Sequence, residues 1–220
     1  SRWRPELIPS LQPTSLHFDL YLVTDRNQTR GGDLPWVVEQ ALEAGVKGIQ
    51  LREKDLGGRD LFFLAERIGA LCKTYNVSLL INDRIDVALA VDADGVHLGS
   101  GSLPVKSARE LLGDEKLIGV STHSVKEARK AEQAGADFIL FGPVYFTPSK
   151  AAYGEPQGPT RLKEIVEKIS LPVYAIGGIK MANIREIKKT GIRGIALISA
   201  VMAAADPAGA SREILKLLKQ

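Results

Sequence analysis

Short apolar runs and helical patterns alternate along almost the whole chain. The apolar runs, such as LYLVT, SLLIN, FILFG and IALIS, are nearly continuous and do not alternate with polar residues. Strands of this kind are buried on both faces, which is typical of a parallel sheet. We expect eight of them, at residues 19–25, 48–54, 77–83, 95–99, 116–123, 138–145, 172–178 and 194–200.

The segments between these strands repeat apolar residues at the 3.6-residue period of an amphipathic helix. The clearest expected helices cover residues 34–44, 59–75, 125–134, 160–169, 181–190 and 211–218. Eight rounds of strand and helix predict an α/β fold, a single closed (β/α)8 TIM barrel. The alternative is an open, doubly wound parallel sheet. It is disfavoured because no G-x-G-x-x-G turn follows the first strand.

The first residues do not share this pattern. Residues 1–17 contain three prolines and show little periodicity. We therefore expect a short N-terminal arm over residues 1–17, followed by the barrel over residues 18–220.

Composition narrows the class of protein further. The 220 residues are 45% hydrophobic and 25% charged, which suits one globular domain. The net charge of +3 includes no polybasic block, so we expect no nucleic-acid partner. No membrane-spanning or signal-peptide stretch is evident, and we expect a cytoplasmic protein. The single cysteine, Cys72, lies in an apolar helical pattern and is expected to pack in the core.

Polar residues gather where the predicted strands end, and the carboxyl-terminal rim is where TIM barrels place their active sites. At the end of the second strand, alternation points Gln50, Arg52 and Lys54 into the barrel mouth. Two cations and an amide at a narrow opening suit a phosphate or pyrophosphate. The alternative is a solvated strand end that Glu53 neutralises.

Two further strand ends carry candidate chemistry. Asn82 and Asp83 end the third strand, where a carboxylate beside cations could bind Mg²⁺ together with pyrophosphate oxygens. The same pair could instead cap the following helix. His123 ends the fifth strand and could act as a general acid or base, or be structural. His97, inside the fourth strand, is expected to be a packing residue.

The last three strands predict a second anion site on the same mouth. Two hydroxyls and an ammonium group lie within residues 147–150, in a loop rich in glycine and proline. Gly177 and Gly178 end the seventh strand. The loops after strands seven and eight of such barrels commonly bind phosphate through backbone N–H groups. A tight turn without a ligand is the alternative for the two glycines.

Taken together, these motifs resemble the thiamine phosphate synthase and TenI superfamily. The matching stretches are YLVTD at 21–25, QLREK at 50–54, INDR at 81–84, GVHLG at 95–99, IGVSTHS at 118–124, FGPVYFTPSK at 141–150, AIGGI at 175–179 and ISA at 198–200. They lie in the family's order and cover nearly everything after Phe18. Eight collinear motifs are much more specific than any one of them.

The resemblance implies a transferase of the thiamine-phosphate diphosphorylase type. It would join hydroxymethylpyrimidine pyrophosphate to thiazole phosphate with Mg²⁺, giving thiamine phosphate and pyrophosphate by a dissociative route. The residues implied to hold the pyrimidine pyrophosphate are Gln50, Arg52, Lys54, Asn82, Ser121 and Lys150. Those implied to hold the thiazole phosphate are Thr147, Ser149, Gly178, Ile198 and Ser199. Asp83 is implied to bind the metal.

One position departs from the synthase pattern. Synthases usually carry a second metal-binding aspartate after the fourth strand, whereas this chain has Ser102. That serine looks more like the TenI branch, whose members isomerise a thiazole carboxylate phosphate with a histidine at the place of His123. The retained pyrophosphate residues favour the synthase. A tautomerase and a non-catalytic regulator that binds thiazole or thiamine phosphates remain the alternatives.

The number of subunits is not determined by these patterns. Barrels of this kind often pair, so a homodimer is one expected state, and the arm at residues 1–17 could serve as a contact.

Overall fold

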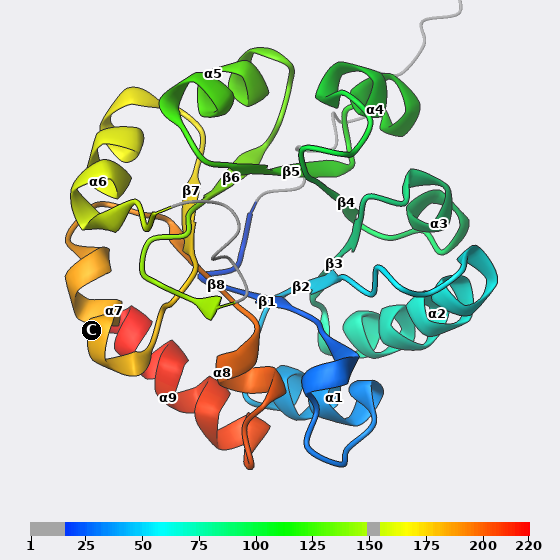
Figure 1. Ribbon diagram of the computed structural model, residues 1–220. Helices are drawn as coiled ribbons and strands as arrows, with labels where there is room; N and C mark the ends of the chain where they lie inside the picture. The colour runs from blue at the N-terminus through cyan, green and yellow to red at the C-terminus, as the bar shows by residue number, and fades with distance from the viewer. Residues whose placement is uncertain (1–15, 149–154) are drawn as a thin grey trace, which may run out of the picture.

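Eight parallel strands close into one barrel in the computed structural model, which describes residues 16–148 and 155–220. Each strand pairs with the next and β8 pairs with β1 (Figure 1). The strands are β1 (Leu20–Val23), β2 (Gly48–Leu51), β3 (Ser78–Asn82), β4 (Gly95–Leu98), β5 (Leu117–Thr122), β6 (Phe138–Phe141), β7 (Val173–Ile176) and β8 (Gly194–Leu197). This closed order confirms the predicted TIM barrel and excludes the doubly wound sheet.

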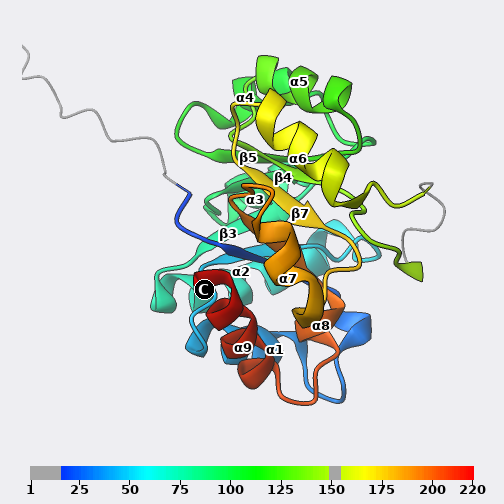
Figure 2. The ribbon, with the colours of Figure 1, turned by 90° about the vertical axis from the view of Figure 1, so that its left-hand side faces the viewer.

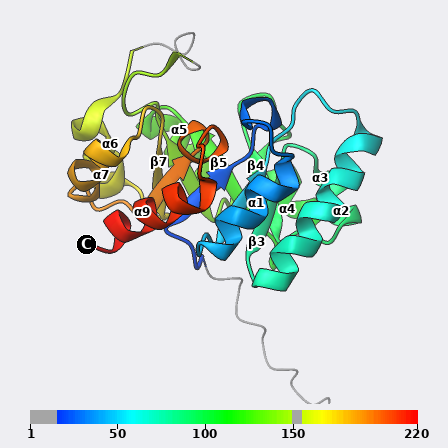
Figure 3. The same ribbon diagram turned by 90° about the horizontal axis from the view of Figure 1, so that it is seen from below.

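Helices surround the barrel (Figure 1). They are the 3-10 helix η1 (Arg26–Gln28), α1 (Leu34–Glu43), α2 (Gly58–Tyr75), α3 (Ile85–Ala90), α4 (Val105–Leu112), α5 (Val125–Gln133), α6 (Gly158–Lys168), α7 (Met181–Lys188), α8 (Ser199–Met202) and α9 (Pro207–Lys219). The last helix, α9, packs beside α1 and α7 and so closes the outer ring (Figure 3). The short helices α3, α4 and α8 were not among the clearest expected helices, because few turns give the helical period little length in which to emerge.

Aromatic rings fill the inside of the barrel at its amino-terminal end. Phe18, Tyr21, Phe138 and Tyr174 lie with ring centroids 5.1–6.3 Å apart. Glycine makes room for them, because a Cβ atom on Gly119 would lie only 2.4 Å from the ring of Phe138. The rings therefore fill the barrel interior below the mouth, which lies at the carboxyl-terminal end of the strands.

A second apolar layer lies between the strands and the helices. Along β1, Leu20 and Leu22 belong to this outer layer, whereas Tyr21 belongs to the inner one. Both faces of each strand are buried, which explains the nearly continuous apolar runs in the sequence. Cys72 lies in the outer layer, where burial raises the pKa of its thiol to about 12, so its predicted packing role is confirmed.

Every strand ends one to four residues before the predicted end. After β7, Gly177 and Gly178 have φ angles of +98° and +64°, which lie outside the range of extended strands. After β8, Ser199 already begins α8. The polar and glycine residues that follow the strands therefore belong to rim loops and not to the sheet.

The chain enters the barrel at the end opposite this rim, as Figure 2 shows for β1 relative to α8. The carbonyl of Leu16 accepts a hydrogen bond from Arg193 Nη2 (3.1 Å), and Leu16 packs against the inner residues. Residues 1–15 of the predicted arm lie outside the described residues. Over the described ranges, the helices are too short or too polar to cross a membrane.

Candidate active site

The end of β2 brings an amide and two cations to the rim. Gln50 is only 2% exposed, and its side chain hydrogen-bonds with Tyr21 inside the barrel. Arg52 is half-buried two residues later, and strand alternation places it on the same face as Gln50. Lys54 is exposed and follows the strand in a turn. Strand alternation therefore does not fix the direction of the Lys54 side chain.

Glu53 does not neutralise a solvated strand end, so that alternative is wrong. Its side chain is only 1% exposed, and its carboxylate pairs with the Arg26 guanidinium at 3.0 Å. Arg26 follows β1 and is 27 residues away in sequence. The acid between the two rim cations is therefore paired with a third cation on the neighbouring strand end.

Asn82 and Asp83 lie side by side at the end of β3. Asn82 is half-buried, whereas Asp83 is exposed and has a left-handed backbone with φ of +64°. Aspartate tolerates that conformation better than most residues. The capping alternative is wrong, because the N-cap residue of α3 is Arg84 and no side chain caps the helix. The Asp83 carboxylate is therefore not used in a helix cap.

A hydrogen-bonded chain runs beneath the mouth from β1 to β5. His97 Nε2 lies 2.9 Å from Ser121 Oγ, and His97 Nδ1 lies 3.5 Å from Tyr21 Oη. Burial raises the pKa of Tyr21 well above its usual value, so this phenol stays protonated. His97 is buried, as expected of a packing residue, but it also contacts a predicted site residue.

His123 lies on the rim next to the end of β6. Its Nδ1 is 2.6 Å from the carbonyl of Gly142, which can only accept a hydrogen bond. Nδ1 therefore carries a proton, and in the neutral ring Nε2 is the acceptor. The backbone amide of His123 donates to Glu127 Oε2 (2.7 Å), which fixes the start of α5 against the rim.

The β6–α6 loop begins with two described anchors. The amide of Val144 donates to the carbonyl of Ile176 (3.0 Å), and the Tyr145 hydroxyl donates to Glu186 of α7. Thr147 is half-buried on this loop. Two other predicted site residues of the loop lie outside the described residues, namely Ser149 and Lys150.

The turn after β7 has a backbone that favours glycine. The carbonyl of Gly177 accepts from the amide of Tyr145 (3.0 Å), and the carbonyl of Gly178 accepts from Asn183 Nδ2 (3.1 Å). A carbonyl and the following N–H point in opposite directions across a trans peptide. The amides of Gly178 and Ile179 therefore point away from these partners. The adjacent β8 ends just before Ile198, which is followed by Ser199 at the start of α8.

Only one of the two expected metal positions carries a carboxylate. Asp83 supplies it, whereas Ser102 Oγ accepts a hydrogen bond from the amide of Gly99 (2.9 Å) and closes the β4–α4 turn. Among the described residues, no three acidic, histidine or cysteine side chains form a metal-binding group. Mg²⁺ often takes one or two carboxylates and completes its shell with water and substrate phosphates. Asp83 fits such a shared ion, but the described residues alone offer no complete cage.

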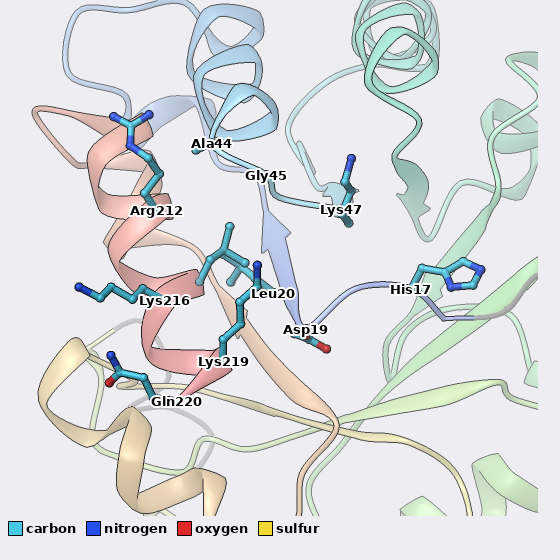
Figure 4. Close-up of a pocket in the computed structure, with 11 residues that line it drawn as sticks. His17, Asp19, Leu20, Ala44, Gly45, Lys47, Arg212, Lys216, Lys219 and Gln220 are labelled. Carbon is cyan, nitrogen blue, oxygen red and sulfur yellow. The ribbon is translucent and has the colours of Figure 1, made fainter.

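A cavity of about 670 Å³ lies at the other end of the barrel, between the start of β1 and α9. Lys47, Lys216 and Lys219 line it together with Asp19. Their ammonium groups do not converge, since Lys216 and Lys219 extend in different directions (Figure 4). None of the predicted site residues that the structure describes lines this cavity, so the rim remains the candidate site.

Comparison with known proteins shows which family this chain resembles. Residues 20–201 match the family model described as thiamine monophosphate synthase. The thiamine-phosphate synthase of Clostridium novyi (strain NT) is 46% identical, and the match covers 92% of this chain and 99% of the relative. That of Syntrophomonas wolfei is 45% identical, with 91% and 96% covered.

A solved structure agrees with these matches. The thiamine phosphate pyrophosphorylase from Pyrococcus furiosus superimposes with a TM-score of 0.84 at 40% identity, and the match covers 92% of this chain and 96% of that one. The family resemblance drawn from the motifs is thus confirmed over most of the chain. The chain belongs to the thiamine monophosphate synthase family.

Proposed function

We propose that this chain is a thiamine-phosphate synthase, a transferase that condenses hydroxymethylpyrimidine pyrophosphate with thiazole phosphate. One observation carries the proposal: Gln50 and Asn82, from the motifs shared with the family, lie at the carboxyl ends of the paired strands β2 and β3, and Arg52 directly follows β2. Relatives that are 45–46% identical over nearly their whole length carry the synthase name, which supports the synthase over the tautomerase.

The pyrimidine pyrophosphate occupies the side of the mouth formed by β2, β3 and β5. Gln50, Asn82 and Ser121 bind and orient it, and Arg52 and Lys54 hold the pyrophosphate group, joined by Lys150. The bond between the pyrimidine methylene carbon and the pyrophosphate oxygen breaks, and its electrons leave with the pyrophosphate. Cations already placed around the leaving group stabilise the charge that develops there. This step needs no protein nucleophile.

The thiazole phosphate occupies the opposite side, at the ends of β6, β7 and β8. Its phosphate is bound by the turn at Gly177 and Gly178, through the amides of Gly178 and Ile179, and by the residues that complete this pocket, Thr147, Ser149, Ile198 and Ser199. The thiazole nitrogen then lies near the pyrimidine methylene carbon, and its lone pair forms the new C–N bond. Holding the two reactants close together accounts for much of the rate enhancement.

This condensation adds no proton to the thiazole and removes none. In the synthase, His123 therefore acts by binding and by fixing the rim. In a tautomerase it would be the acid or base, and activity would depend on it. His123→Ala consequently separates the two reactions.

Magnesium is part of the proposal. Asp83 would hold the ion, and the ion would neutralise charge on the leaving pyrophosphate. Because Ser102 replaces the second carboxylate, we expect the ion to depend on the substrate oxygens more than it would in a site with two aspartates.

We place the reaction in the cytoplasm, and we propose that two copies of the chain form a homodimer. Light scattering coupled to size-exclusion chromatography tests the dimer, and a single species at the monomer mass of 23.8 kDa would contradict it.

The function is tested by incubating the protein with both substrates and MgCl₂ and measuring thiamine phosphate by chromatography. We expect product from the parent protein and almost none from Arg52→Ala. A folded parent that makes no thiamine phosphate would overturn the proposal. If that same protein isomerises the thiazole carboxylate phosphate without magnesium, and loses this activity in His123→Ala, the tautomerase is the correct assignment.

A further inference from the structure

A cluster of three residues, Thr24, Arg26 and Glu53, joins the end of β1 to the end of β2. The hydroxyl of Thr24 donates to Glu53 Oε1 (2.7 Å). The amide of Arg26 donates to both carboxylate oxygens (3.1 and 3.2 Å), and Arg26 Nη1 donates to Oε2 (3.0 Å). The buried carboxylate of Glu53 is thus met by a hydroxyl, an amide and a guanidinium, as a buried charge requires.

This Thr24–Arg26–Glu53 cluster also holds the backbone that carries Arg52. The hydroxyl of Thr24 accepts a hydrogen bond from the amide of Arg52 (2.9 Å), and the amide of Thr24 donates to the carbonyl of Gln50 (2.9 Å). The segment from Gln50 to Glu53 is therefore attached to one buried threonine at three points. This keeps Arg52 in line with the strand although the sheet pairing of β2 ends at Leu51.

Arg26 acts on Lys54, the second rim cation, through Glu53 and Asp55, the two acids on either side of Lys54. Its Nη1 and Nη2 donate to the two carboxylate oxygens of Asp55 (2.6 and 2.7 Å), while Nη1 also reaches Glu53. Lys54 stands between these two acids in the chain. One guanidinium thus occupies both carboxylates that neighbour Lys54 in the chain, so neither is left to pair with Lys54 alone.

We propose that Thr24, Arg26 and Glu53 are positioning residues that direct Arg52 and Lys54 toward the pyrophosphate group of the substrate. This inference rests on the proposed function, because it takes Arg52 and Lys54 as the pyrophosphate ligands. None of the three needs to touch the substrate. Their effect passes through the backbone of residues 52–54 and through the removal of competing negative charge.

The test compares Arg26→Ala and Arg26→Lys with the parent protein. Lysine keeps the charge but lacks the planar fork that holds two carboxylates at once. Arg109→Lys is the matched control, because Arg109 similarly bridges a carboxylate, Asp137, and loop carbonyls, and it does so at the amino-terminal end of the barrel. The measurements are KM for each substrate, kcat, the calorimetric Kd of inorganic pyrophosphate with Mg²⁺, and Tm.

We expect Arg26→Ala to raise KM for the pyrimidine pyrophosphate and the Kd of pyrophosphate by about tenfold or more, since small misplacements of binding groups have effects of that order. Arg26→Lys should fall between Ala and the parent. KM for thiazole phosphate should change by less than about twofold in both. Arg109→Lys should lower Tm by about as much as Arg26→Lys does, while both KM values stay unchanged.

Three outcomes overturn the inference. The first is a rise of KM for both substrates by the same factor in Arg26→Ala. The second is a rise of both KM values in Arg109→Lys. Each would indicate a general structural loss. The third is an unchanged Kd for pyrophosphate. Arg52→Ala separates this failure from that of the proposed function: if Arg52→Ala also binds pyrophosphate normally, the pyrophosphate site itself is misplaced. If only Arg52→Ala loses pyrophosphate binding, the Thr24–Arg26–Glu53 cluster alone is rejected.

Discussion

Gly178→Ala adds a single Cβ atom to the turn that is proposed to bind the thiazole phosphate, and so tests that side of the mouth. The residue has φ of +64°, and a Cβ atom there would lie 2.7 Å from the carbonyl oxygen of Phe146 and 2.7 Å from Cβ of Tyr145. The left-handed backbone alone costs alanine about 1–2 kcal/mol. Pushing back a loop that is in contact costs about 1–3 kcal/mol more. The expected loss is therefore about 2–5 kcal/mol in the free energy of unfolding.

Gly135→Ala is the matched control for the backbone cost. Gly135 has φ of +96°, and a Cβ atom there would meet only Arg109, at an ordinary 3.9 Å. It follows α5, at the amino-terminal end of the barrel. Its substitution should cost only the conformational part, about 1–2 kcal/mol. Chemical denaturation of both variants gives the difference.

Kinetics then separate packing from ligand binding. If the Gly178 amide binds the thiazole phosphate, its displacement removes a hydrogen bond to a charged group, about 1.5–3 kcal/mol. KM for thiazole phosphate should rise by about 10–100-fold, whereas KM for the pyrimidine pyrophosphate should change little. An unchanged KM for thiazole phosphate in a folded Gly178→Ala variant would refute the phosphate site and favour a simple turn. A stability loss no greater than that of Gly135→Ala would refute the tight contact.

Four other predictions follow from the same geometry. Arg52→Ala should weaken pyrophosphate binding by about 10–100-fold, measured by calorimetry, and full retention of affinity would show that the cation faces elsewhere. Ser102→Asp should lower the Mg²⁺ concentration needed for half-maximal rate, and an unchanged magnesium curve would contradict the placement of the ion. Cys72 should react with a thiol reagent only after unfolding, because burial keeps it protonated; rapid labelling of the native protein at pH 8 would be inconsistent with this. The hydrogen bonds from Arg26 lower the pKa of Asp55, so their stabilising effect is complete above about pH 4 and is lost as the pH falls through the lowered pKa. Tm of the parent protein should therefore fall at acid pH, and Asp55→Asn should make this fall less steep. An equal dependence of Tm on pH in the parent and the variant would contradict this role of Asp55.

The barrel was predictable because burial on both faces leaves its own pattern in the sequence. Leu20 and Leu22 face helices while Tyr21 faces the aromatic interior, so all three are apolar and the run reads as a buried strand. The same alternation predicted that Gln50 points inward. Where the strands end was not predictable in this way. In β2 the end depends on the hydroxyl of Thr24, which binds the amide of Arg52 in place of a neighbouring strand.

Pairings between distant residues were the part that sequence patterns could not give. Glu53 stands between two cations in the chain, and proximity in sequence suggested that it neutralises them. Its partner is Arg26, 27 residues earlier, because alternation turns Glu53 away from the mouth toward the end of β1. The contact of His97 with Ser121 was missed for a similar reason, since an inward histidine within a strand reads as packing. In both cases the outward or inward direction was predictable, but the partner was not.

We infer that one mouth holds two anions on opposite sides, and a crystal structure with both ligands would show whether it does. The protein would be crystallised with Mg²⁺, pyrophosphate and thiazole phosphate. We expect pyrophosphate against Arg52 and Lys54 with the metal at Asp83, and the thiazole phosphate group at the amides of Gly178 and Ile179. Pyrophosphate bound away from Arg52, or either ligand found only in the lysine-lined cavity at the other end of the barrel, would contradict it.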